Sequence, residues 1–325
     1  MQLSEDQMLR IGPLLDPQTY RSDAPLTLLV ARMRNAIGDW VLTLSMIKIV
    51  NQQFPNIRVD VDMANAPSGW ADMLATWDVV AAPVTNPDPY DYDYYTGHLL
   101  YPILDDGALH VEDVEYGGAH LITGMCRTLK LRTGLPLKYP GETRARYIGP
   151  GIEELLPELA LPDEFIAMVS VGRPNNRDSV HKEWPIAYLH AISNAARQRY
   201  SLVQLALPGH PKLQSADRVL DKLTLIQLCA VLGQAKLVIA LENGISHIAG
   251  HTGAHCITLY REGARAQPMH VGYPKQYQII LSECDALTVS PEAKSDCVNK
   301  AKHLISNVIA PRRGPKIWEV GHNAI

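Results

Sequence analysis

The pattern of apolar and polar positions alternates between strand and helix along the first part of the chain. An apolar run that begins at Leu26 predicts a buried parallel strand, and residues 40–54 have the apolar spacing of a helix. A strand at 57–63, a helix at 67–76 and a strand at 78–82 are expected next. Because strands that alternate with helices form parallel sheets, this part is expected to be an α/β domain.

The alternation restarts at residue 165, after a stretch from 135 to 162 in which prolines and glycines cluster without periodicity. The expected elements are strands at 165–172, 201–209, 236–241 and 255–260, helices at 185–200, 224–232 and 244–251, and a helical segment in the tail from 291. The sequence therefore predicts two Rossmann-like domains, 1–155 and 156–325, whose parallel sheets face an interdomain cleft. We also expect the tail to pack back on the first domain.

Composition is that of a folded globular protein of two domains. At 325 residues the chain exceeds one compact core, and 46% hydrophobic with 20% charged residues is an ordinary balance. A formal net charge of −4 gives no general attraction to nucleic acid or to an anionic membrane surface. Five cysteines without a C-x-x-C pair predict reduced thiols, and neither a signal peptide nor a membrane-spanning run is recognised, so we expect a cytoplasmic protein.

Polar turns follow three of the expected strands, at the edge of a parallel sheet where ligands bind. The first turn holds Gly38, which permits unusual backbone angles, and Asp39, which begins a helix. Taken alone, it is better explained as an ordinary helix cap. The second turn, 172–185, carries Arg173 and Lys182, which can hold phosphates together with the amides of the following helix. In isolation, a solvated polar loop is the better explanation.

The third turn runs from Glu242 to His247 and is the most informative. The Glu242 carboxylate can accept both ribose hydroxyls of a nucleotide, and Gly244 lets the backbone approach a diphosphate at a helix N-terminus. Ser246 and His247 can donate further hydrogen bonds, and Asn243 lies in the same turn. A capped helix with a half-buried His247 explains these residues equally well.

Taken in order, these turns resemble glycosyltransferase family 9, the bacterial ADP-heptose:lipopolysaccharide heptosyltransferases. The family opens with a strand and a Gly-Asp turn into an apolar helix, like IGDWVLTLSMIKIV here, and later has a Lys-x-Trp-Pro helix start, found at 182–185. Its donor motif, Asp-Ser/Thr-Gly-x-x-His, is matched with two substitutions at 242–247. The resemblance covers residues 26–281 and implies a GT-B fold. It also implies inverting, metal-independent transfer from a nucleotide sugar, which is a co-substrate rather than a cofactor.

Carried over by position, the resemblance implies Asp39 as the catalytic base, Lys182 on the donor phosphates and Glu242 near the donor nucleoside. Gly244 and His247 match the glycine and histidine of the family motif. Donor binding is then expected mainly in the C-terminal domain. Further donor-binding candidates from the same turns are Arg173, Asn243 and Ser246.

The chain departs from the family pattern at two places. Glu242 and Asn243 replace the usual aspartate and serine or threonine, and the extra methylene moves the carboxylate farther than a hydrogen bond tolerates. Where this chain reads LYREGARAQP, the family typically has Phe-Gly and a threonine or serine that help to enclose the donor phosphates. The resemblance therefore does not fix ADP-heptose as the donor.

The acceptor is expected to contact loops of the N-terminal domain. Residues 87–102 are rich in tyrosine, proline and aspartate and predict a loop with some edge strand, and a helix is expected at 120–132. Tyr92 and Tyr94 can stack on a sugar, although a solvated tyrosine-rich edge is an equal alternative. Arg34, or the tail PRRGPK, can instead hold an anionic acceptor such as a phosphorylated lipid core or a nucleic acid. A neutral glycan is preferred.

Two rival functions remain beside the transferase. A sugar-nucleotide epimerase of the same fold would need acid and base groups around the donor sugar but no acceptor. A binding protein that lost transfer would explain the altered pair Glu242-Asn243, but it would not need the carboxylate of Asp39. Other enzyme classes find no support, because the motifs G-x-G-x-x-G, G-x-x-x-x-G-K-[ST], H-E-x-x-H and G-x-S-x-G are missing.

Overall fold

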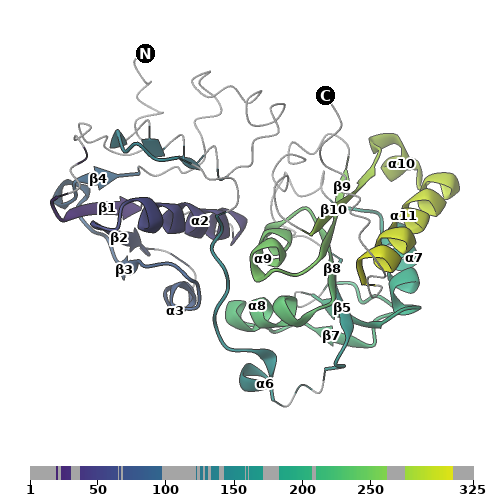
Figure 1. Ribbon diagram of the computed structural model, residues 1–325. Helices are drawn as coiled ribbons and strands as arrows, with labels where there is room; N and C mark the ends of the chain where they lie inside the picture. The colour runs from purple at the N-terminus through teal and green to yellow at the C-terminus, as the bar shows by residue number, and fades with distance from the viewer. Residues whose placement is uncertain are drawn as a thin grey trace. The chain divides into compact units, whose positions relative to one another are not determined.

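The computed structural model divides the chain into two compact units (Figure 1). Unit 1 comprises residues 1–149 with 268–272, and unit 2 comprises 150–267 with 273–325, where the sequence-based boundary falls after residue 155. The structure describes residues 20, 23–30, 37–64, 66, 69–96, 122, 125–126, 129–130, 133–138, 143–157, 159, 161–170, 183–206, 210–261 and 275–309. Each unit is described by itself, so the predicted interdomain cleft stays a prediction.

Unit 1 is built on one parallel sheet of four strands in the order β3-β2-β1-β4. Its elements are β1 (Leu26–Val30), α2 (Ile37–Gln53), β2 (Ile57–Asp62), α3 (Trp70–Leu74), β3 (Ala82–Val84), the 3₁₀ turn η1 (Pro89–Asp91) and β4 (Tyr94–Tyr95). The predicted alternation of strand and helix is confirmed, as is an edge strand within the tyrosine-rich loop. The described residues between 122 and 130 are helical, as expected for 120–132.

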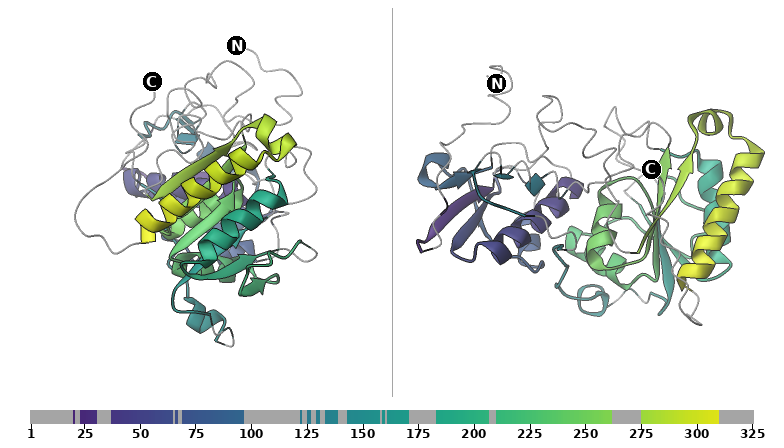
Figure 2. Two further views of the ribbon diagram at one scale, coloured as in Figure 1. Left: turned by 90° about the vertical axis from the view of Figure 1, so that its right-hand side faces the viewer. Right: turned by 45° about the horizontal axis from the view of Figure 1, so that its top comes forward.

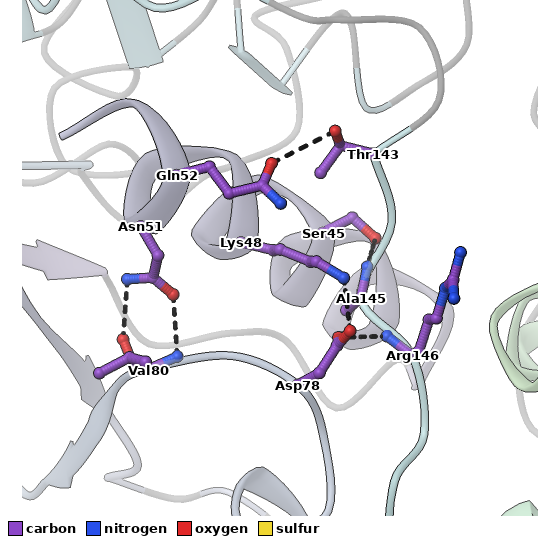
Figure 3. Close-up of polar contacts among 9 residues, drawn as sticks. All are labelled: Ser45, Lys48, Asn51, Gln52, Asp78, Val80, Thr143, Ala145 and Arg146. Carbon is purple, nitrogen blue, oxygen red and sulfur yellow. Dashed lines mark hydrogen bonds and ion pairs between the residues drawn. The ribbon is translucent and has the colours of Figure 1, made fainter. Parts of the chain in front are cut away.

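The third strand was predicted at 78–82, and this position is wrong, because β3 spans 82–84. Residues 78–80 bind the helix α2 instead of the sheet (Figure 3). The Asp78 carboxylate pairs with Lys48 and accepts the backbone N–H of Arg146. The side-chain amide of Asn51 donates to Val80 O at 2.9 Å and accepts from Val80 N at 2.8 Å. The side chains of α2 thus replace the hydrogen bonds that a strand partner would supply.

Helix α2 is apolar on nearly all sides and is buried accordingly. Its few polar side chains hold the chain segments that cross it. Ser45 Oγ accepts a hydrogen bond of 3.1 Å from the backbone N–H of Ala145 (Figure 3). The side-chain amide of Gln53 accepts a hydrogen bond of 3.0 Å from the backbone N–H of Lys138 and donates to the carbonyl of the same residue. The stretch that ends unit 1 is therefore fastened to α2, the helix whose first turn contains Asp39.

We expect Gly149→Ala to destabilise the protein by roughly 1–3 kcal/mol, because overpacking a filled position forces its neighbours apart. A Cβ at Gly149 would lie 2.7 Å from the Tyr147 hydroxyl and 2.8 Å from Thr76 Cβ. Gly151→Ala is the matched control, since a Cβ there meets no atom within 4 Å. Thermal or urea unfolding of both variants measures the difference, and equal stabilities would contradict the close packing at Gly149.

Unit 2 is built on a six-stranded parallel sheet in the order β10-β9-β8-β5-β6-β7. Its strands are β5 (Phe165–Val169), β6 (Ser201–Leu205), β7 (Arg218–Leu220), β8 (Leu237–Leu241), β9 (Cys256–Arg261) and β10 (Gln276–Leu281). Its helices are α6 (Ile152–Leu155), α7 (Ile186–Arg197), α8 (Leu225–Gln234), α9 (Gly244–Thr252), α10 (Glu283–Thr288) and α11 (Pro291–Ile309). All elements predicted from residue 165 onward are confirmed, and α6, β7, β10 and α10 are additional, α6 lying in the stretch 135–162 that was expected to be without periodicity.

Helices cover both faces of this sheet. Helices α7 and α11 lie side by side (Figure 2) and form the main core with the strands, whereas α8 and α9 pack together on the other face (Figure 1). The tail was expected to pack back on the first domain, but its described part, α11, packs on α7 within unit 2. The basic run PRRGPK lies outside the described residues.

All five cysteines are free, and four of them are buried, as expected for reduced thiols. Burial raises the pKa of the Cys229 thiol to about 12, so it is inert as a nucleophile at neutral pH. Among the described helices, none combines the length and the apolar character that a bilayer crossing requires.

Candidate functional site

Each sheet reverses its strand order once, and ligands of open parallel sheets bind outside the carboxyl ends of the strands at such a point. In unit 1 the reversal lies between β1 and β4, because β2 and β3 follow on one side of β1 and β4 lies on the other. The chain that leaves β1 enters α2, which begins at Ile37, so Asp39 lies inside the first turn and does not begin the helix as the sequence predicted. Arg34 and the side chain of Asp39 lie outside the described residues.

In unit 2 the reversal lies between β5 and β8. Two of the predicted polar turns leave the sheet here, one after each of these strands. The loop after β5 includes Arg173 and Lys182, and both lie outside the described residues. The turn after β8 is described in full and brings Glu242, Asn243 and the start of α9 to the carboxyl edge. The strand order thus places the turn after β8 at the reversal point, and the donor-binding role of both segments stays a prediction.

Glu242 is buried, with 3% of its surface exposed, at the end of β8. Its backbone N–H donates to Leu259 O of β9 at 3.2 Å and so continues the ladder between the two strands. A buried carboxylate loses its hydration. Such a side chain is stable in the charged form only when other contacts compensate for this loss. The structure places this residue at the carboxyl edge of the sheet, and its contact with a nucleotide stays a prediction.

Asn243 caps α9 and makes the turn rigid. Its side-chain oxygen accepts Ile245 N at 2.9 Å, its backbone oxygen accepts Ser246 N at 3.2 Å, and the Ser246 hydroxyl donates to that same oxygen at 2.6 Å. The capped helix is therefore confirmed. Two N–H groups at this helix end, of Ile245 and Ser246, already donate within the turn, and the approach of a diphosphate to Gly244 stays a prediction.

His247 was expected to be half buried and is more enclosed than that, with 4% exposure. Its backbone carbonyl accepts a hydrogen bond of 2.8 Å from Nδ1 of His251, a residue that is 2% exposed. Since a carbonyl only accepts, the His251 ring carries its proton on Nδ1. The first and second turns of α9 are thus linked, and the contact of His247 with a donor stays a prediction.

Gln204 is a buried residue near this edge that the sequence reasoning missed. Its side-chain nitrogen donates to Ser170 Oγ and to Pro211 O, each at 2.8 Å, and its side-chain oxygen accepts Leu213 N at 2.8 Å. Ser170 directly follows β5, so Gln204 holds the residue at the end of this strand. A glutamine inside the apolar run SLVQLAL was the available signal.

The tyrosines proposed for the acceptor differ in their surroundings. The Tyr92 hydroxyl donates to Asp60 Oδ2 at 2.9 Å, and Arg58 pairs with the same oxygen at 3.0 Å. The pKa of Tyr92 is raised to about 12, mainly by burial and to a smaller extent by the hydrogen bond to Asp60. Tyr94 is 1% exposed and pairs with Leu28 in the sheet. This is a correction, because a ring enclosed in the core offers no face to a sugar.

The acidic residues of the same loop hold it in place. The Asp93 carboxylate accepts Thr27 N at 2.8 Å and Thr27 Oγ1 at 2.9 Å, and Asp88 accepts Tyr90 N at 2.9 Å. Thr27 lies in the first half of β1, away from the carboxyl edge of the sheet. Tyr90 is 72% exposed and is the tyrosine of this loop that solvent reaches most freely.

Within the described ranges, no group of three His, Cys, Asp or Glu side chains is arranged to hold a metal ion. The aspartate pair of β2 has structural partners. Asp60 binds Tyr92, and Asp62 Oδ1 accepts Ala64 N at 2.9 Å and Asn86 N at 3.2 Å. These bonds connect the turns that follow β2 and β3.

Residues 171–303 match the family model of glycosyltransferase family 9 (heptosyltransferase). This stretch belongs to glycosyltransferase family 9. The match runs from the end of β5 through the turn at Glu242 and into α11, so the resemblance drawn from the sequence motifs is confirmed. The family match indicates that the chain is a glycosyltransferase that uses a nucleotide sugar. A comparison with curated protein sequences finds no match.

Solved structures of family 9 enzymes share this fold. ADP-heptose lipopolysaccharide heptosyltransferase II of E. coli is 15% identical, with a TM-score of 0.57 over 87% of this chain and 99% of that one. The E. coli heptosyltransferase WaaC with ADP is 14% identical, with a TM-score of 0.55 over 85% and 100% of the two chains. At these identities the likeness shows the fold, which is GT-B as expected.

A third similar structure is the iron-containing dodecameric glycosyltransferase TibC from enterotoxigenic E. coli H10407. It is 12% identical and has a TM-score of 0.58 over 90% of this chain and 79% of that one. A metal therefore occurs in one structural neighbour of this chain.

Proposed function

We propose that this chain transfers a heptose or hexose from a nucleotide sugar to a hydroxyl of a glycan or lipid-linked glycan, with inversion at the sugar carbon and without a metal ion. A nucleic-acid acceptor ranks below a glycan because the net charge is −4. The nucleotide sugar is a co-substrate, and the reaction takes place in the cytoplasm.

The observation that carries this proposal is the turn at the strand-order reversal of unit 2. A buried carboxylate at Glu242, a glycine at the next helix start and a rigid cap at Asn243 stand together where open α/β sheets bind nucleotides. Glu242 would accept the ribose hydroxyls, and Gly244 would let the backbone approach the diphosphate. Ser246, His247, Arg173 and Lys182 complete the proposed donor-binding set.

Asp39 supplies the general base in this proposal. Inverting transfer in one step requires removal of the proton from the acceptor hydroxyl while that oxygen attacks the sugar carbon. Asp39 is in the first turn of α2, at the strand-order reversal of unit 1, which is the ligand-binding edge of that sheet. The acceptor side is assigned to unit 1, with Arg34 and Tyr92 as the remaining candidates.

The test is incubation of the protein with a panel of sugar nucleotides, with and without glycan acceptors. Transfer to an acceptor supports the proposal. Epimerisation of the donor without an acceptor would support the epimerase alternative. Binding without any turnover would identify a non-catalytic nucleotide-sugar protein, for which the altered pair Glu242-Asn243 is the motive.

We expect full activity in excess chelator. In a metal-independent transferase the charge of the leaving diphosphate is met by lysine and by helix N-termini, which chelators do not remove. Initial rates before and after exhaustive treatment with EDTA measure this. Loss of activity that returns with magnesium, manganese or iron would contradict the expectation, and iron is included because TibC contains it.

A further inference from the structure

The C-terminal half of α7 and the chain before β7 line a surface pocket of about 480 Å³, a volume within the usual range of small-ligand sites. The described residues that line it are Asn194, Arg197, Gln198, Gln214 and Ser215. The first three are spaced three and four residues apart, so they share one face of the helix end. The pocket thus joins one helix face to a segment that follows β6.

This pocket lies away from the candidate donor turn. Helix α7 returns the chain from the carboxyl end of β5 to the amino end of β6, and Asp217, just before β7, donates its backbone N–H to Leu202 O of β6 at 2.8 Å. Glu242 directly follows the carboxyl end of β8. Because the six strands are parallel, the pocket lies toward the opposite edge of the sheet.

The lining offers hydrogen-bond donors and acceptors side by side. Ser215 is 7% exposed, and its hydroxyl donates to Ser193 Oγ at 2.7 Å, which donates in turn to His190 O at 3.0 Å. The proton of Ser215 is thus engaged, and its oxygen is left to accept. The side-chain amides of the lining both donate and accept. Sugar hydroxyls, which also do both, match such a mixed polar set.

Arg197 adds an oriented positive charge to the lining. Its Nε and Nη2 donate to Asp217 Oδ1 at 3.0 and 2.7 Å, and Oδ2 of the same carboxylate accepts Leu202 N at 2.8 Å. Asp217 is thereby fixed and holds the plane of the guanidinium, while these bonds leave Nη1 to donate to a ligand. The Arg197 side chain is 56% exposed, so a ligand can reach it.

The two segments that line the pocket carry an excess of positive charge. Residues 190–199 and 210–218 contain one carboxylate, Asp217, and four exposed cations, Arg197, Arg199, Lys212 and Arg218. The whole chain, by contrast, has a formal net charge of −4. A local excess of this sign attracts anions to the pocket.

We propose that this pocket is a second ligand site of the chain, which binds a saccharide that carries a phosphate or carboxylate group. Arg197 contacts the anionic group, and the amides of Asn194, Gln198 and Gln214 bind the hydroxyls together with the Ser215 oxygen. The inference goes beyond the proposed transfer reaction and does not depend on it, because the pocket shares no residue with the candidate donor and acceptor sites.

The test separates the anionic group from the sugar. Glucose 6-phosphate, glucuronate, glucose and inorganic phosphate are titrated at millimolar concentrations into the full chain, with calorimetry or NMR as the measurement. Arg197→Gln removes the charge, and Asn194→Ala removes one amide at a helix position that favours alanine. Lys300→Gln is the matched control, because Lys300 is 55% exposed and pairs with Asp296 on α11. Melting temperatures of all variants are recorded alongside.

Glucose 6-phosphate and glucuronate should bind more tightly than glucose or inorganic phosphate. Arg197→Gln should lower the affinity for both anionic sugars about three- to tenfold, which is less than for an enclosed charge because water and salt screen this group. Asn194→Ala should lower the affinity for glucose 6-phosphate about fivefold and leave that for inorganic phosphate unchanged. The control should bind like the wild type.

Wild-type affinity for glucose 6-phosphate in both variants would overturn the proposal, as would a wild type that binds neither anionic sugar at millimolar concentrations. Inorganic phosphate that binds as tightly as glucose 6-phosphate would also overturn it, because the pocket would then recognise an anion and no sugar. So would displacement of glucose 6-phosphate by ADP, GDP, UDP or CDP, which would assign its binding to a nucleotide site. If Arg197→Gln does not fold, Asn194→Ala decides.

Discussion

Asp39→Asn should lower turnover by about a hundred to ten thousand fold, the range over which a positioned general base contributes to catalysis. Asparagine has nearly the shape of aspartate, but it cannot take the proton of the acceptor hydroxyl. Asp39 lies in the first turn of α2, so donor affinity in unit 2 and the melting temperature should change little. Steady-state kinetics, donor titration and thermal unfolding of one preparation measure all three.

Asp72→Asn is the matched control for this experiment, because Asp72 is an exposed acidic residue in the first turn of α3 in the same unit. It should retain wild-type turnover. Near-normal turnover in Asp39→Asn would remove Asp39 from the reaction. A loss of activity in proportion to a loss of folded protein would identify Asp39 as a residue that only stabilises the first turn of α2.

The sequence predicts the two sheets well because their strands are short, almost wholly apolar runs between helices of regular spacing. β8 and β9 are buried at every position, and runs of this kind are typical of central parallel strands. β7 is only three residues long, and β10 alternates exposed and buried positions as an edge strand does, so neither shows that signal. The third strand of unit 1 was misplaced because residues 78–80 bind side chains of α2, and such contacts leave no local pattern.

The part of the candidate site whose residues are contiguous in one turn could be predicted from the sequence. The parts formed by segments far apart along the chain could not. Glu242 to His247 are contiguous, so their spacing was enough to predict a capped turn after a strand. Gln204 and Ser170 lie 34 residues apart, and their contact depends on the pairing of β5 with β6. The sequence predicts Tyr94 as a ring that can stack on a sugar, because the pairing of β4 with β1, in which Tyr94 is buried, joins segments far apart along the chain.

We expect Glu242 to bind the ribose hydroxyls of the donor. Glu242→Gln keeps the size of a side chain that is 3% exposed but removes the charge that two hydroxyls would donate to. Binding of the preferred nucleoside diphosphate should then weaken by about 1.5–3 kcal/mol, which is roughly tenfold or more in affinity. Lys182→Ala should give a loss of similar size through the phosphates.

The ligand itself provides the sharpest control. With the 2′,3′-dideoxy form of the same nucleotide, the wild type and Glu242→Gln should bind with equal affinity, because the hydroxyls that distinguish them are gone. Glu164→Gln serves as the protein control, since Glu164 pairs with Lys236 at an exposed position just before β5, at the opposite edge of the sheet. If Glu242→Gln lowered the affinity for the ribose and dideoxy forms equally, the carboxylate would stabilise the turn and would not bind the ribose hydroxyls. If it weakened neither, Glu242 would have no part in donor binding.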